Sequence, residues 1–175
     1  MGTVGRPVTL LGVLAAVSAL ALALEQGKRP EPVEPRLLDL RVEQVTGIRI
    51  EEDGRELRAV RGEEGWQVEM PGDTRPGAST AVADMVRAVT GLIPVDTFAR
   101  GDIRPGDLGL DPPRVRVTLT LDGGAPSVTL LFGDFVPTGG SVYATIAGDP
   151  RVFQIGAMVM SDIERTFYLA LEPPS

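Results

Sequence analysis

Three carboxylates lie within ten residues near the middle of the chain. Asp102, Asp107 and Asp111 occur in a stretch rich in Gly and Pro. Carboxylate oxygens in a flexible loop can ligate Ca²⁺. Here the spacing is five and four residues instead of the alternate-residue spacing of an EF-hand loop, and Arg104 lies among them. We therefore interpret the cluster as a solvated turn in which Asp side chains accept hydrogen bonds from backbone N–H groups, and we predict no metal or cofactor site.

Two further features have residue types that can recognise a ligand. Trp66 alternates with Val68 and Met70, which predicts a core position for the indole ring; a sugar-stacking platform is the alternative. Residues 133–140 begin and end with glycine and can form either a flexible recognition loop or a wide connection between strands.

The composition removes most catalytic machinery. The sequence has no Cys and no His, so thiolate chemistry and the commonest general base are absent. It also lacks a G-x-S-x-G nucleophile motif and a phosphate-binding G-x-x-x-x-G-K motif. A hydrolase with two Asp or Glu residues stays open, although no spacing favours a particular pair. We expect no enzyme, and the net charge of −7 argues against a nucleic-acid partner.

The N-terminal region contains an uncharged run at residues 8–24. About 17–25 apolar residues suffice for a helix to cross a bilayer, so the run predicts a membrane anchor. Its apolar anchor residues are Val8, Leu10, Leu11, Val13, Leu14, Val17, Leu20, Leu22 and Leu24. A cleaved signal peptide is an alternative, because Ala19-Leu20-Ala21 has the form of a cleavage site. A buried core helix fits less well, because the run has no polar face.

The charges that flank this run bear on its orientation. Arg6 precedes the run, whereas Lys28, Arg29 and Arg36 follow it, so the positive-inside count weighs mildly against export. A short basic start before a long apolar run favours export. We expect the C-terminal domain to be extracytoplasmic.

The remaining chain divides by composition. Residues 25–35 contain three prolines, which favour an extended spacer. We therefore assign residues 1–24 to the anchor or signal segment, 25–35 to a Pro-rich linker, 36–171 to one folded domain and 172–175 to a tail.

Within the domain, hydrophobic periodicity predicts the elements. Apolar and polar residues alternate, as in half-buried antiparallel strands. The predicted strands cover 47–51, 56–60, 66–70, 93–99, 115–121, 127–132, 142–146 and 152–155. Apolar residues at helical spacing predict a central amphipathic helix over about 79–90, and a short final helix is predicted over 157–165. The fold class is α+β, mainly antiparallel β meanders with these two helices, preceded by one transmembrane helix. A duplicated meander-plus-helix unit is possible.

Several short motifs occur in an order that resembles a known family. They are Gly47-Ile48-Arg49-Ile50, Gly65-Trp66-Gln67-Val68, Pro71, Ala83-Asp84, Leu108-Gly109-Leu110-Asp111-Pro112-Pro113, Val117-Thr118-Leu119, Leu131-Phe132-Gly133, Pro137-Thr138-Gly139-Gly140, Tyr143 and Val152-Phe153. Over most of the stretch from Arg36 to Leu171 the chain resembles the bacterial DUF4340 family. The resemblance implies an N-terminal membrane segment and an association with ABC-type export or gliding-type machinery. It implies no catalytic residues.

These observations lead to three functional hypotheses. The first is a non-catalytic accessory or interaction domain, anchored by its N-terminal helix in a bacterial inner membrane, with protein partners in an envelope or transport complex. The second is an extracytoplasmic module that binds a glycan or peptide through the Asp-rich or Gly-rich loops. The third is a carboxylate-dependent hydrolase. The sequence identifies no small-molecule ligand.

Overall fold

The computed structural model describes residues 36–69, 78–101 and 103–171. The chain divides into two units, Met1–Glu34 and Pro35–Ser175, and every described residue belongs to the second unit. The predicted anchor at 8–24, the linker at 25–35 and the tail at 172–175 lie outside the described residues. Within the described ranges, no helix has both the length and the hydropathy that crossing a membrane requires.

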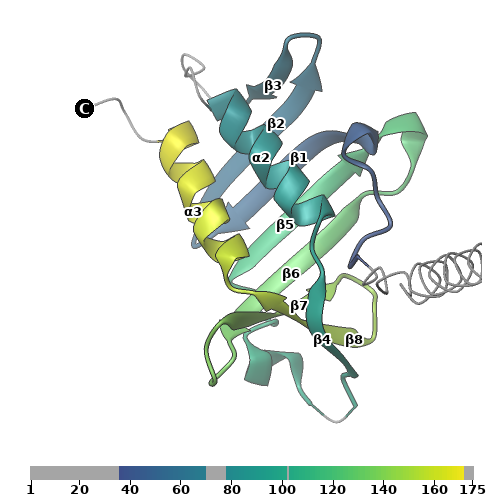
Figure 1. The fold of residues 1–175 in the computed structure, drawn as a ribbon, viewed down its shortest axis with the longest axis vertical. Coiled ribbons are helices and arrows are strands. Elements are labelled where there is room, and N and C mark those ends of the chain that lie inside the picture. Colours follow the sequence, from purple (N-terminus) through teal and green to yellow (C-terminus); the bar gives the residue numbers. More distant parts are fainter. Residues whose placement is uncertain (1–35, 70–77, 102, 172–175) are drawn as a thin grey trace, which may run out of the picture. The chain divides into compact units, whose positions relative to one another are not determined.

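The domain is built on one sheet of eight antiparallel strands (Figure 1). The spatial order of the strands is β3-β2-β1-β5-β6-β7-β8-β4. Their bounds are β1 Val45–Glu52, β2 Arg55–Gly62, β3 Gly65–Val68, β4 Pro94–Ala99, β5 Val115–Leu121, β6 Val128–Phe135, β7 Ser141–Ile146 and β8 Arg151–Gly156. The predicted α+β class with antiparallel strands is confirmed. The two predicted strand sets form a single sheet, because β1 pairs with β5.

Alternation places one face of this sheet in the core. Ile48 lies opposite Leu119, and Ile50 lies opposite Val117; all four side chains are buried. The residues between them along the strands are polar or charged, as a half-buried sheet requires. In β1 and β5 the apolar positions of the predicted strands therefore identify the core face correctly.

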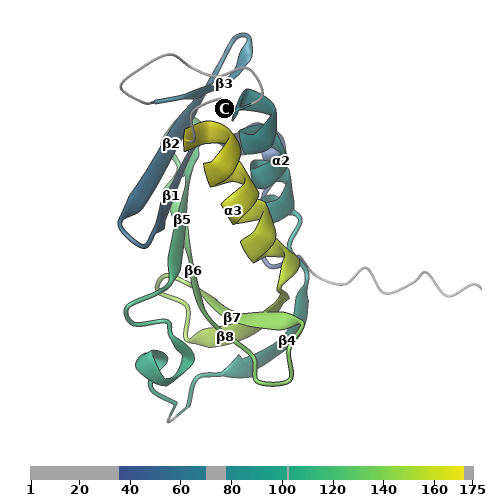
Figure 2. The same ribbon diagram turned by 90° about the vertical axis from the view of Figure 1, so that its left-hand side faces the viewer.

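Two helices cover the same face of the sheet (Figures 1 and 2). The predicted central helix is α2, Ala78–Thr90. The apolar residues whose helical spacing predicted it are all buried: Val82, Met85, Val86 and Val89. The final helix, α3, spans Met158–Leu171 and is longer than the predicted 157–165. Its buried stripe continues from Ile163 through Phe167 to Ala170, so packing against the sheet and α2 stabilises the additional turns.

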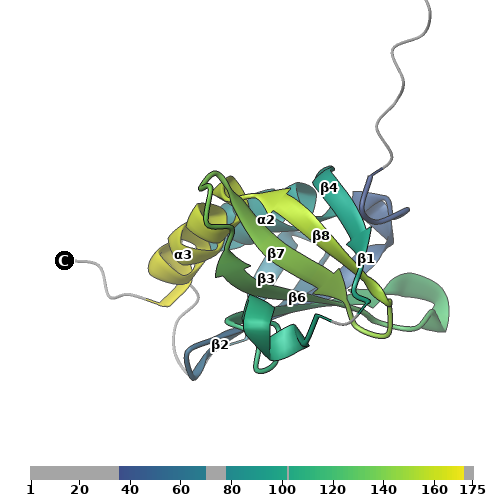
Figure 3. The same ribbon diagram turned by 90° about the horizontal axis from the view of Figure 1, so that it is seen from below.

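The sheet bends between β6 and β7. Their register shifts between Phe132 and Phe135, which marks a bulge. Beyond it, β7, β8 and β4 run across the direction of β1, β5 and β6 (Figures 2 and 3). The connection between β4 and β5, which carries the short 3-10 helix η2 (Pro105–Leu108), lies on the face of the sheet away from α2 and α3 (Figure 2).

This connection has a small core of its own. Leu108, Leu110 and Val152 are buried together, and Phe98 and Tyr143 pack against them. The two rings meet edge to face with centroids 6.4 Å apart. The connection therefore closes the helix-free face of the bent end of the sheet, and only part of the stretch predicted as a solvated turn is solvated.

Candidate functional site

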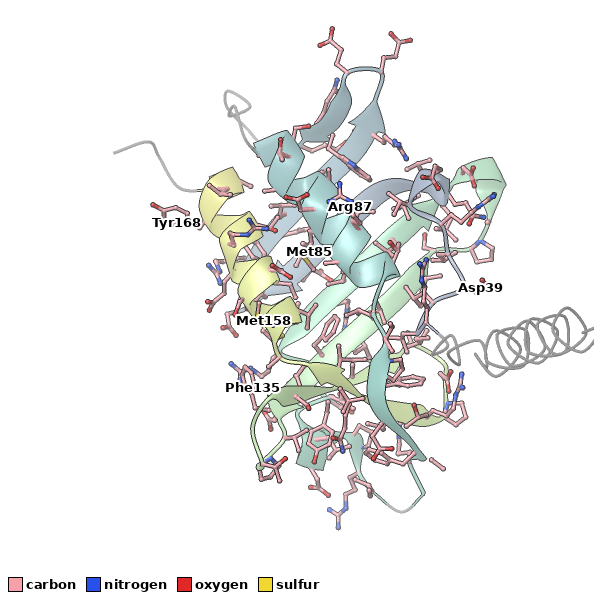
Figure 4. All side chains as sticks on the ribbon, viewed as in Figure 1. Asp39, Met85, Arg87, Phe135, Met158 and Tyr168 are labelled. Carbon is pink, nitrogen blue, oxygen red and sulfur yellow. The ribbon has the colours of Figure 1, made fainter. Side chains whose placement is uncertain are left out.

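A cavity of about 420 Å³ opens beside the first turns of α3. The end of β1, the β6–β7 connection and α3 contribute to its lining. The lining residues used below are Glu52, Arg114, Phe135, Met158, Met160 and Glu164. Figure 4 shows Phe135 and Met158 close to the lower end of α3. The cavity thus combines charged and apolar side chains next to a helix end.

Glu52 is the most unusual residue of the cavity. It ends β1 on the same side as Ile48 and Ile50, so its carboxylate occupies a position where alternation expects an apolar side chain. Glu52 is only 8% exposed, and Arg55 donates a hydrogen bond to its carboxylate. Burial raises the pKa of Glu52 above its usual value against the lowering effect of Arg55.

A second carboxylate, Glu164, borders the same cavity from α3. It is exposed, and its charge contributes to the raised pKa of Glu52. The described residues contain no cluster of three or more acidic side chains that could hold a metal ion. The cavity therefore offers a pair of carboxylates.

The rim of the cavity carries two exposed apolar side chains and one guanidinium. Met158 is 74% exposed and Phe135 is 46% exposed, which is unusual for large apolar side chains. The guanidinium of Arg114 lies over the Phe135 ring, 5.5 Å from its centroid. We call Phe135, Met158 and Arg114 the α3 rim. Sequence reasoning missed the rim, because isolated apolar residues at element ends give no periodic signal.

A family model described as "Domain of unknown function (DUF4340)" matches residues 76–168, more than half of the chain. The chain belongs to the DUF4340 family. No curated protein and no solved structure matches it. The DUF4340 match begins after β3, although β1 pairs with β5 inside the matched stretch. The sheet of this DUF4340 domain is therefore larger than the matched segment.

The Gly-Leu-Asp-Pro-Pro stretch of this DUF4340 chain has a structural explanation. Leu108 and Leu110 are buried, and Gly109 between them has a φ of 65°. A Cβ at Gly109 would approach the side chain of Asp134 to 2.6 Å. The stretch therefore seats the β4–β5 connection on the sheet, and a glycine is required where the backbone turns.

The predicted Asp cluster does not assemble among the described residues. Asp107 and Asp111 are exposed, and Asp102 lies outside the described residues. The N–H of Asp107 donates to the carbonyl of Arg104 over 3.0 Å, which closes one turn of η2. The two described carboxylates therefore lie at the surface of a turn, but among the described residues neither accepts the hydrogen bond from a backbone N–H group that was predicted.

Two other predicted features are now placed. Trp66 is 6% exposed within the main core, which confirms its core position and excludes an open stacking platform. Gly133 lies in β6, where a Cβ would come within 2.1 Å of the carbonyl of Leu108. Gly139 and Gly140 have φ near 77° and 76° in the β6–β7 turn. The stretch 133–140 is thus partly strand and partly tight turn.

Proposed function

We propose that this DUF4340 domain is a non-catalytic, membrane-anchored accessory domain that binds a partner protein through the α3 rim. The observation that supports this proposal is the exposure of Met158, 74%, next to Phe135. Exposed apolar patches favour protein contacts, and methionine adapts its shape to different partners. The proposed partner is a membrane component of a bacterial envelope, ABC-type transport or gliding-type complex.

The proposed tether is the uncharged run at residues 8–24. A single anchor of this length, followed by a proline-rich spacer, would hold the domain a short distance from an inner membrane. The domain would then be extracytoplasmic and have access to neighbouring membrane proteins.

A site-specific photocrosslink tests the proposal on the full-length chain in native membranes. Met158 is replaced by p-benzoylphenylalanine, and Ala125, exposed in the β5–β6 connection, receives the same group as a control. We expect one membrane protein to be captured repeatedly from position 158 and not from position 125. Met158→Asp should abolish copurification of that protein, whereas Ala125→Asp should not. Equal capture at both positions, or recovery of the chain alone, would contradict the proposal.

A second candidate function is a carboxylate-dependent hydrolase. It is favoured by one observation, the presence of Glu52 with a raised pKa and Glu164 around the same cavity. A general acid with a raised pKa and a second carboxylate are the groups that glycoside hydrolysis requires. A panel of chromogenic glycosides tests this function. Turnover that is lost in both Glu52→Gln and Glu164→Gln would support it, and absence of turnover by the natural protein would remove it.

A further inference from the structure

The chain enters the folded domain beside the start of β4. The N–H of Leu37 donates to the carbonyl of Leu92, in the connection between α2 and β4, over 2.7 Å. The next residue, Leu38, is 4% exposed and belongs to the main core, so packing fixes this attachment as well. The proposed tether, which ends before Arg36, is therefore joined to the domain next to residues 92–95.

Two apolar side chains are exposed at this point of the surface. Ile93 is 44% exposed and Val95 is 67% exposed, and neither is part of a core cluster of the described residues. Leu37 and Leu92 beside them are partly exposed. Neighbouring exposed apolar side chains mark contact sites for proteins or membranes. We call Ile93 and Val95 the β4 patch; neither residue borders the cavity beside α3.

A β-bulge in the edge strand determines the position of Val95. β4 is the last strand of the sheet and pairs with β8 (Figure 1). Pro94 lies opposite Ile155 and Asp96 lies opposite Gln154, so Val95 has no partner in β8. Bulges at sheet edges change the direction of a side chain and interrupt pairing. The exposure of Val95 is therefore a property of the strand and not of a loose end.

The same strand is poorly suited to pairing with an added strand. Pro94 supplies no N–H group, and the N–H of Thr97 donates to the carboxylate of Asp96 over 2.7 Å. The bulge between Pro94 and Asp96 also interrupts the regular spacing of the backbone groups. The strand thus offers a partner its apolar side chains and few of its backbone groups.

The charges near the patch do not attract an anionic surface. The charges of residues 25–36 cancel, because three carboxylates and three cations occur there: Glu25, Glu31, Glu34, Lys28, Arg29 and Arg36. Within the domain, Asp39 and Asp96 are exposed. Attraction of basic residues to anionic headgroups therefore contributes little here, and a contact with lipid has to depend on burial of apolar area.

We propose that the β4 patch rests on the lipid surface of the membrane that holds the domain, with Ile93 and Val95 at the depth of the headgroups. This contact depends on the membrane anchor of the proposed function. Residues 25–35 span at most about 40 Å at full extension, so the tether keeps the patch close to the bilayer. Tethering makes the contact intramolecular, and two apolar side chains then suffice where they would not hold a free domain. At headgroup depth, water still satisfies the open backbone groups of an edge strand.

A fluorescent label at the patch tests the contact in the full-length chain. The sequence has no cysteine, so a single cysteine can be labelled. Val95→Cys carries the fluorophore NBD, and Glu64→Cys carries it as the control, because Glu64 is exposed in the β2–β3 turn at the other edge of the sheet. Both chains are reconstituted into phosphatidylcholine vesicles with and without a doxyl-labelled lipid that quenches at headgroup depth. We expect quenching of most of the emission at position 95, little at position 64, and no increase when phosphatidylglycerol is added.

Flotation of the vesicles distinguishes failure of the anchor from failure of the contact. A chain that does not float with the vesicles would contradict the anchor and the contact together. A chain that floats but is quenched equally at positions 95 and 64, or is not quenched at position 95, would overturn the lipid contact alone. A change in emission at position 95 that occurs only in native membranes would assign the patch to a protein and would also overturn the lipid contact.

Substitution distinguishes the effect of the natural side chains from that of the label. With NBD at Thr97→Cys, the double variant Ile93→Ser and Val95→Ser should lose the quenching, because the apolar area that holds the contact is gone. Val60→Ser removes an apolar side chain that is 40% exposed in β2, and as the matched control it should leave the quenching unchanged. Melting temperatures should change little, because all three side chains are exposed. Should the double variant fail to fold, Val95→Ser alone replaces it. Quenching that persists without these side chains would overturn the assignment of the patch.

Discussion

The backbone N–H of Trp66 donates to the hydroxyl oxygen of Ser79 over 3.0 Å. This bond joins the outermost strand, β3, to the first turn of α2. At the opposite end of the sheet, the N–H of Thr97 in β4 donates to the carboxylate of its neighbour Asp96 over 2.7 Å. Unpaired N–H groups of edge strands are templates for pairing with other chains. On each edge of this sheet, therefore, one backbone N–H group donates to a side-chain oxygen and is not available to pair with another chain.

Ser79→Ala should lower the free energy of unfolding by about 1 kcal/mol, because the Trp66 N–H loses its partner. Alanine is a better helix former than serine, so helix propensity opposes this loss and cannot cause it. Urea denaturation measures the change. Thr80→Ala, at an exposed position of the same turn, is the matched control and should not destabilise the domain. Equal losses in the two variants would show that the bond does not matter.

Gly133→Ala should lower the free energy of unfolding by about 1–3 kcal/mol. A Cβ at this position would lie 2.1 Å from the carbonyl oxygen of Leu108, so either β6 or the β4–β5 connection has to move. Gly156→Ala is the control, because nothing lies within 4 Å of its added Cβ in β8. Thermal unfolding compares the two, and a Gly133→Ala variant as stable as Gly156→Ala would argue against the close packing.

Glu52 should make the domain less stable as the pH rises. Its pKa is raised in the folded state, so the folded chain binds more protons than the unfolded chain above the ordinary value of 4.5. The free energy of unfolding therefore falls from that pH up to the raised pKa and is constant beyond it. Glu52→Gln should abolish this pH-dependent component. The free energy of unfolding of the variant, relative to that of the natural protein, should therefore increase from acidic to neutral pH. Urea unfolding at a series of pH values measures the difference.

Glu56 supplies a control of opposite sign. A hydrogen bond from Arg58 lowers the pKa of Glu56. Glu56 therefore stabilises the fold fully at a pH above its ordinary pKa, and this stabilisation is lost as the pH falls through the lowered pKa. Glu56→Gln should therefore lose stability relative to the natural protein as the pH rises. A Glu52→Gln profile with the same sign as Glu56→Gln would show that the buried carboxylate is not penalised.

Thr145→Val should cost about 1 kcal/mol of unfolding free energy. The hydroxyl of Thr145 is buried and donates to the carbonyl of Arg151 over 2.8 Å across the β7–β8 turn. Valine has nearly the same shape but cannot donate. Thr97→Val, on the exposed edge strand, is the control for the change in β propensity, and calorimetry compares the two melting temperatures.

Local periodicity predicted the elements that bury one regular face. The alternation in β5 and the helical spacing from Val82 to Val89 in α2 identified both elements and their inward faces. The extra turns of α3 were missed because the predicted end at residue 165 preceded Phe167, whose burial is set by tertiary packing. The pairing of β1 with β5 was missed because it joins residues far apart in the chain.

The candidate site was less accessible from sequence than the fold. Glu52 had a usable signal, since a carboxylate ends an alternating strand on its apolar side. Glu164 and Met158 had none, because their proximity to Glu52 depends on how α3 is placed. The burial of Leu108 and Leu110 was not predicted, because the residues around them are polar and indicated a solvated turn.

The position of β1 between β2 and β5 constrains when the sheet can form during synthesis. Val45–Glu52 is synthesised early, yet one of its two neighbours, Val115–Leu121, leaves the ribosome only after α2, β4 and the long connection have been made. Pairing between such distant segments slows folding. Until then β1 has no partner on one of its two sides. The nascent chain therefore stays unfinished through much of its synthesis, which is the condition in which a polypeptide can still be threaded through a translocation pore.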